Sequence, residues 1–250
     1  MAQVPQRQAP RRSAVRGPIF IRLLANLADV DVAPSTPSLA DRLGQWLDWS
    51  HAIALSTSLD GAPPAADPAA SRSDSAEQDE CARMRSSLTR SITGDRALAV
   101  AGHHGKAQAE EVRAQEAVDY AVFRQHYVLL QRSMQAATGN LRGRLRDALV
   151  PRSAGMARLA AVDAAMEAAL SPREQALLAR VPGLLGGHFE RLQQAGQKGL
   201  ADAAATKEAA STSPRTWLDV FRKDMQSVLL AELDVRFQPI EGLLAALRTR

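Results

Sequence analysis

The sequence predicts an all-α protein, an elongated helical bundle with coiled-coil character. Hydrophobic residues make up 46% of the chain, but aromatic residues make up only 4%, and Ala and Leu dominate the apolar fraction. Ala, Leu, Arg, Gln and Glu are strong helix formers, whereas β-rich cores draw on Val, Ile, Thr and aromatic residues. Apolar residues recur at helical spacing, and no segment alternates convincingly with a period of two. A chain of 250 residues can bury a sizeable core in one or two domains.

Composition divides the chain into four parts. Residues 1–17 are rich in Gln, Pro and Arg and lack an apolar period, which predicts a disordered basic tail. Residues 18–59 form an N-terminal helical segment, and residues 60–75, which mix Pro, Ala, Asp and Ser, form a linker. Residues 76–250 form the main helical bundle.

The N-terminal segment holds a short helix over residues 18–30 and a second helix with a clear start. Pro37 suits the first helical position, and alternatively Ser38 and Asp41 form a capping box. We expect Trp46 in the core and leave the place of Trp49 open. The second helix carries one apolar stripe, formed by Leu39, Leu43, Trp46, Leu47, Ile53 and Ala54.

The main bundle begins with a helix over residues 75–101 and continues with the most regular pattern in the chain. Apolar residues there step alternately by three and four, as in a heptad seam. Gly139 and Asn140 can kink or end this helix, and Pro151 stops it. The seam consists of Tyr120, Phe123, Tyr127, Leu130, Met134, Ala137 and Leu141, and Leu145 and Leu149 continue the stripe.

The C-terminal half is predicted from prolines and apolar spacing. Ser171, Pro172 and Glu174 resemble a helix start, with a bend expected at Pro182, and Pro239 is expected to end a helix that begins near Pro214. A last amphipathic helix follows. The helix before residue 171 carries a stripe formed by Met156, Leu159, Val162, Met166 and Leu170.

Charge and cysteine usage favour a cytoplasmic protein without membrane insertion. The formal net charge is +4, but residues 1–25 hold five Arg and no acid, whereas residues 26–80 hold ten acidic residues and two Arg. Such segments of opposite charge can pair with each other or meet separate partners. The lone Cys81 excludes an internal disulfide and a multi-cysteine zinc site, and no apolar run is long enough to span a bilayer.

The sequence offers no support for an enzyme, and we assign no catalytic residue, no cofactor and no metal. His103 and His104 lie between glycines, but a metal site would need a third ligand. Lys106 follows Gly105 without the other residues of a phosphate-binding loop. His126 shares a helix with Asp119 at a spacing that is common by chance, so a partly buried surface histidine is the simpler interpretation.

Three segments resemble an uncharacterised helical family, a domain of unknown function of β- and γ-proteobacteria. They are Gly17 to Leu24, Ser38 to Trp49, and Trp217 to Pro239. Members of this family look to be encoded near membrane proteins similar to flagellar-stator and TolQ/ExbB proton channels, and near OmpA-like peptidoglycan-binding proteins. The resemblance implies a cytoplasmic accessory subunit of a cell-envelope complex, and it supplies no catalytic residue.

Two hypotheses of function follow. The first is a helical interaction protein that binds another helical protein, or itself, through seam residues Tyr120, Phe123, Tyr127, Leu130 and Met134. The same stripe can instead be core. The alternative is a nucleic-acid-associated regulator that contacts phosphates through Arg142, Arg144 and Arg146, the densest basic run in the chain.

Overall fold

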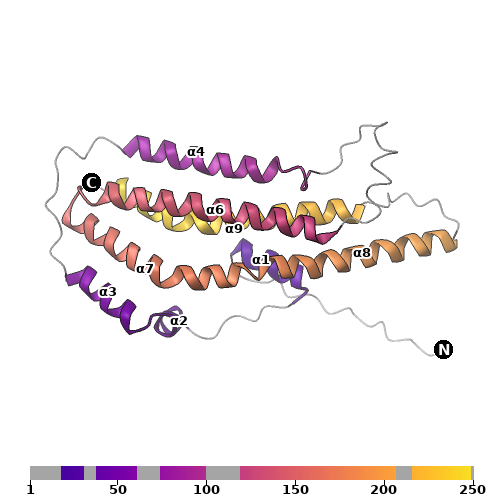
Figure 1. Ribbon diagram of the computed structural model, residues 1–250, viewed down its shortest axis with the longest axis horizontal. Helices are drawn as coiled ribbons and strands as arrows, with labels where there is room; N and C mark the ends of the chain where they lie inside the picture. The colour runs from indigo at the N-terminus through magenta and orange to yellow at the C-terminus, as the bar shows by residue number, and fades with distance from the viewer. Residues whose placement is uncertain (1–17, 31–37, 61–73, 100–118, 207–215, 249–250) are drawn as a thin grey trace, which may run out of the picture.

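The computed structural model describes residues 18–30, 38–60, 74–99, 119–206 and 216–248 and confirms the all-α prediction. Every regular element in these ranges is an α-helix. Most of the helices run along the long axis of the molecule (Figure 1). The predicted tail at 1–17 and the core of the predicted linker, 61–73, lie outside the described residues. The helices are α1 (Ile19–Ala28), α2 (Leu39–Trp46), α3 (Trp49–Asp60), α4 (Asp74–Thr93), α6 (Tyr120–Leu149), α7 (Ala154–Leu178), α8 (Val181–Thr206) and α9 (Thr216–Arg248).

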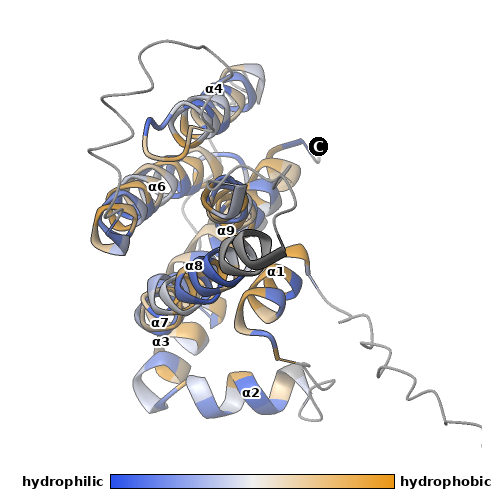
Figure 2. Ribbon diagram, turned by 90° about the vertical axis from the view of Figure 1, so that its right-hand side faces the viewer, coloured by the Kyte–Doolittle hydropathy of each residue, from blue (hydrophilic) through white to orange (hydrophobic). Residues whose placement is uncertain are grey.

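Helix α9 is the centre of the bundle. It packs against α6, α8, α4 and α1, and in the view along the bundle it lies between α6 and α8 (Figure 2). Its apolar residues therefore occur on more than one side of the helix, as expected for a helix with several neighbours. Its fully or nearly fully buried apolar residues include Phe221, Met225, Leu229, Leu233, Phe237 and Ile240.

The N-terminal segment packs on the main bundle at two separate places. Helix α1 contacts α8 and α9, and buries Phe20 and Leu27 there. Helix α3 contacts α7 instead, and α2 with α3 lies on the side of the bundle opposite α4 (Figures 1 and 2). The predicted first helix at 18–30 is confirmed, with Asp29 in the left-handed conformation at its C-terminal end.

The predicted capping box is present, but the helix it opens is short. The backbone N–H of Asp41 donates to Ser38 Oγ at 3.1 Å, and the N–H of Ser38 donates to the Asp41 carboxylate at 3.1 Å. The continuous stripe expected from residue 39 to 54 is wrong, because α2 ends at Trp46 and α3 begins at Trp49. Asp48 stands between them and accepts from the N–H of His51 at 2.9 Å, so it caps the new helix.

The prolines are where the sequence prediction fails most clearly. Pro172 lies inside α7 and Pro239 inside α9, although each was expected at a helix boundary. Pro182 was expected to bend a helix, but it stands in the first turn of α8, where the missing N–H breaks no helical bond. The other two prolines each remove one helical hydrogen bond, and packing of the flanking turns holds both helices together. Pro151 does follow the end of α6, as predicted.

Two further boundaries and one stripe differ from prediction. Helix α4 ends at Thr93 rather than near residue 101, and Gly139 does not interrupt α6. The predicted stripe of α7 is only partly buried, because α7 packs against both α6 and α3 and three alanines take the most buried positions. Leu159 of that stripe is 39% exposed. Its buried residues are Ala157, Ala160, Ala169 and Leu178.

Candidate functional site

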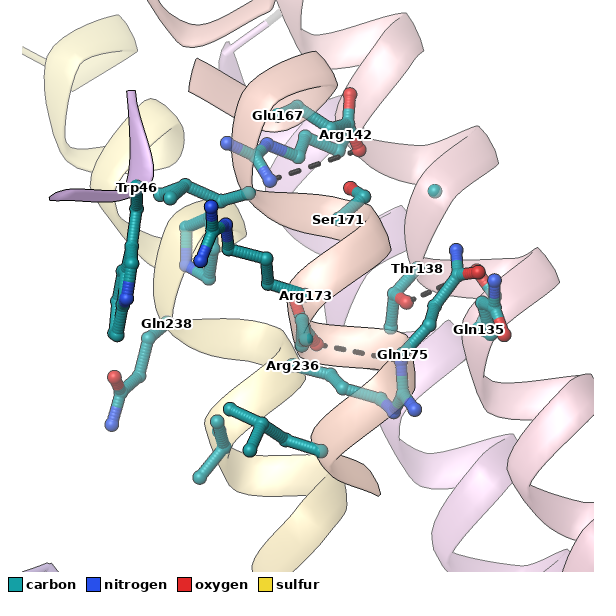
Figure 3. Close-up of a pocket in the computed structure, with 16 residues that line it drawn as sticks. Trp46, Gln135, Thr138, Arg142, Glu167, Ser171, Arg173, Gln175, Arg236 and Gln238 are labelled. Carbon is teal, nitrogen blue, oxygen red and sulfur yellow. Dashed lines mark hydrogen bonds and ion pairs between the residues drawn. The ribbon is translucent and has the colours of Figure 1, made fainter. Parts of the chain in front are cut away.

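A cleft of about 680 Å³ opens between α6, α7 and α9, and Trp46 at the end of α2 forms one wall (Figure 3). Trp46 was expected in the core, but it is only half-buried because α2 ends there and its side chain borders the cleft. Polar groups line the cleft from all three long helices, among them Gln135, Arg142, Glu167, Ser171, Arg173, Glu174, Gln175 and Arg236. Apolar contact comes from Trp46, Leu170, Leu177, Val235 and Pro239.

Beside the cleft lies a buried polar network centred on Glu232 of α9, whose side chain is fully buried. The Tyr127 hydroxyl donates to Glu232 Oε2 at 2.6 Å, and Gln131 Nε2 donates to the same carboxylate at 3.1 and 3.2 Å. Arg236 donates to Glu232 Oε1 from Nε at 3.0 Å and from Nη2 at 2.7 Å. Each carboxylate oxygen therefore has at least two donors, which compensates the loss of water around a buried charge.

Burial raises the pKa of Tyr127 far above its ordinary value, and the neighbouring Glu232 carboxylate raises it further. The hydroxyl therefore remains protonated at every physiological pH and acts as a donor to Glu232. The network joins α6 to α9 in one register. It is a structural element whose outer member, Arg236, reaches the cleft.

The seam predicted from the heptad pattern lies mostly inside the chain. Phe123, Tyr127 and Met134 are buried against neighbouring helices, and Tyr120 and Leu130 are partly buried and pack on the same core. The continuation through Leu145 and Leu149 is buried too. The structure therefore fits the second interpretation of the stripe, a core seam, and leaves little of it for a partner.

At its N-terminal end this seam joins an aromatic cluster. Phe123 and Phe189 each approach Phe221 edge-on, with ring centroids 5.1 and 5.0 Å apart. Trp217 lies over Gly196, where an added Cβ would stand only 2.7 Å from the indole Cδ1. Glycine at 196 is thus what allows α8 and α9 to approach closely.

The three arginines of the nucleic-acid hypothesis all face carboxylates. Arg142 makes a bidentate pair with Asp163, at 2.8 and 2.6 Å, and Arg146 contacts Asp163 and Glu167. Arg144 pairs with Glu80 across the space between α6 and α4. These charges tie α6 to α7 and α4.

Two of the described histidines each contact an aspartate. His126 Nδ1 lies 3.0 Å from Asp95 Oδ2, whereas the Asp119 carboxylate accepts from the backbone N–H of Ala121 at 2.9 Å. His188 Nε2 lies 2.8 Å from Asp224 Oδ2. His103, His104 and Lys106 lie outside the described residues. Within the described ranges, no group of three or more His, Cys, Asp and Glu side chains is placed to hold a metal ion.

Helix α3 presents the most exposed large apolar side chain among the described residues. Trp49 is 80% exposed and Ile53 is 50% exposed, although the sequence contains only three tryptophans. No residue of α3 is buried. No helix in the described part of the chain is long and apolar enough to cross a membrane.

Comparison with known proteins places the chain in a family. Residues 6–249 match the model of the family described as protein of unknown function (DUF3348). The chain belongs to this family. Three sequence segments resembled a domain of unknown function. The DUF3348 family, which is such a domain, covers nearly the whole chain. No curated protein and no solved structure matches it.

Proposed function

We propose that the protein is a non-enzymatic helical interaction protein whose partner docks on the outer face of α3. The observation that carries this proposal is that the Trp49 side chain is 80% exposed. Among the described elements, α7 is the only helix against which α3 packs substantially. An exposed Trp costs solvation free energy that burial by a partner recovers. Trp is also among the residues most enriched at binding hot spots.

The positions of the apolar residues on α3 support a second contact surface, in addition to the surface that packs on α7. At 100° per residue, Trp49 and Ile53 lie on one side of the helix, and the half-buried Leu55 and Ser58 lie on the other side. The half-buried side packs on α7. A helix with apolar residues on two sides is expected to have neighbours on two sides.

Burial of this face by a partner would contribute favourably to association. Covering the exposed part of Trp49 removes roughly 150 Å² of apolar surface from water, which contributes about 4 kcal/mol before the cost of association is subtracted. Ile53 adds to the same patch. The resemblance to proteins encoded near envelope complexes makes the cytoplasmic side of such a complex the first place to look for the partner.

We do not extend the proposal to nucleic acid, because no specific observation favours it. Arg142, Arg144 and Arg146 already have acidic neighbours at ion-pair distance. Phosphate contacts by these residues would have to break those pairs, which reduces the gain from each contact.

The experiment is site-specific photo-crosslinking in cells that express the protein natively. A photoreactive amino acid replaces Trp49 in one variant and Val122, an exposed apolar residue of α6, in the control. We expect a discrete adduct with another polypeptide from position 49 and none from position 122. Crosslinks from position 49 that join only segments of the same chain would refute the proposal, since an internal segment would then cover α3.

A further inference from the structure

Two arginine–glutamate pairs line the cleft. In each pair, the arginine Nη1 lies too far from the glutamate Oε1 to form a hydrogen bond. Arg142 Nη1 stands 3.7 Å from Glu167 Oε1, and Arg236 Nη1 stands 3.6 Å from Glu174 Oε1. Both distances are beyond the usual range for an N–H···O hydrogen bond. Both glutamates come from α7, while the arginines come from α6 and α9. Figure 3 shows Arg142 and Glu167 near one end of the cleft and Arg236 near the other.

Both guanidinium groups are anchored by their other two nitrogens. Nε and Nη2 of Arg142 bind Asp163, and the same atoms of Arg236 bind Glu232. The side chains are 16% and 5% exposed, so neither can swing into solvent. In each case Nη1 is left as a fixed donor at the cleft, opposite a glutamate whose Oε1 is an acceptor.

The spacing of the two pairs matches a short polypeptide. Glu167 and Glu174 are two helical turns apart on α7, about 10.5 Å along its axis. An extended chain covers about 3.3 to 3.6 Å per residue, so three residues span that separation. Ser171 lies between the glutamates, and the apolar wall includes Leu170 and Leu177. The volume of about 680 Å³ lies within the range of small-molecule binding sites.

The balance of charges in the cleft disfavours a ligand that carries charge of only one sign. The cleft and its anchoring residues contain four arginines and four carboxylates, namely Arg142, Arg146, Arg173 and Arg236 with Asp163, Glu167, Glu174 and Glu232. A ligand of one sign would be attracted by half of these groups and repelled by the other half. A zwitterion can place its carboxylate on a guanidinium and its ammonium on a glutamate.

We propose that this cleft binds a short peptide of about three residues with free termini and apolar side chains, one terminus at each arginine–glutamate pair. The carboxylate accepts from an arginine Nη1, and the ammonium donates to a glutamate Oε1. The apolar side chains lie against Trp46, Leu170 and Val235. This site is independent of the outer face of α3, so either proposal can fail without the other.

Isothermal titration calorimetry with the full-length protein and the tripeptide Ala-Leu-Ala tests the proposal. We expect saturable one-to-one binding, and binding at least about tenfold weaker when the N-terminus is acetylated or the C-terminus is amidated, because each block removes one charge-assisted hydrogen bond. Equal affinity for free and doubly blocked tripeptide would overturn the proposal, as would the absence of any binding heat for the free tripeptide across temperatures.

Variants locate the binding in the cleft. Glu174 is 44% exposed, so Glu174→Gln preserves the fold and is expected to weaken Ala-Leu-Ala about tenfold. Ser171→Tyr fills the space between the glutamates and is expected to abolish binding. The matched control is Glu190→Gln, an exposed residue of α8 outside the cleft. Unchanged affinity in both cleft variants, with native circular dichroism, would refute the assignment.

Discussion

Replacing Arg236 by Gln removes the countercharge of a buried carboxylate. Glu232 is fully buried and would keep only its bonds from Tyr127 and Gln131. Breaking a buried ion pair on one side costs about 3–5 kcal/mol, because the remaining charge has no compensation. For a chain of this size each kcal/mol lowers Tm by roughly 2–4 °C, so Arg236→Gln is expected to lower Tm by about 10 °C.

The double variant separates this mechanism from a simple loss of packing. Arg236→Gln/Glu232→Gln removes both charges, so it is expected to be about 2 kcal/mol more stable than Arg236→Gln alone. Urea unfolding followed by circular dichroism measures both values. The control is Arg85→Gln, whose side chain is 40% exposed and pairs with Asp234, and whose loss is expected to cost about 1 kcal/mol or less. The reasoning is refuted if the double variant loses as much free energy of unfolding as the two single variants lose together.

Two other predictions concern tyrosine ionisation and helix contacts. Burial raises the pKa of Tyr120 to about 12 and also raises the pKa of Tyr127, so the neutral phenols stabilise the fold below about pH 10 and this contribution is lost as the pH rises further. These are the only tyrosines, so ultraviolet absorbance at pH 11 should show little tyrosinate in native protein and about nine-tenths ionisation in urea; equal absorbance would contradict the burial. Gly196→Ala places a Cβ against Trp217 and is expected to destabilise the fold by about 1–3 kcal/mol, whereas Gly139→Ala meets nothing within 4 Å and is expected to stabilise α6 by up to about 1 kcal/mol. Thermal unfolding of the two variants compares them directly, and equal midpoints would refute the close contact.

Helical periodicity predicted the fold class and the seam of α6 because burial follows the 3.6-residue period. Tyr127 and Met134 were placed on one stripe from spacing alone, and they are buried together. Spacing cannot tell whether the neighbour that covers a stripe belongs to the same chain. The partner-binding interpretation and the core interpretation therefore had identical sequence signatures.

The polar network was missed because its sequence signature is that of an exposed helix. Glu232 and Arg236 are four residues apart, which is the spacing of ordinary surface ion pairs. The long-range contacts with Tyr127 and Gln131, 105 and 101 positions away, bury the pair. Local sequence spacing therefore gave no sign that this ion pair is buried.

The prolines show how packing overrides local preference. Pro172 follows Ser171 and precedes Glu174, which is the pattern of a helix start, yet α7 continues through it. The loss of one hydrogen bond costs less than breaking the contacts that the following turn makes through Leu178. The cleft depends on this continuity, because Glu167 and Glu174 lie on either side of the proline.

The most direct test of the proposed interaction surface is co-purification from native membrane and soluble fractions with matched double variants. Trp49→Ser/Ile53→Ser alters the outer face of α3, and Val122→Ser/Leu129→Ser removes the same kind of exposed apolar surface from α6. We predict that only the α3 variant loses the partner that cross-links to position 49, with an unchanged unfolding midpoint. The account would be contradicted if the α3 variant co-purified with as much of that partner as the unaltered protein does.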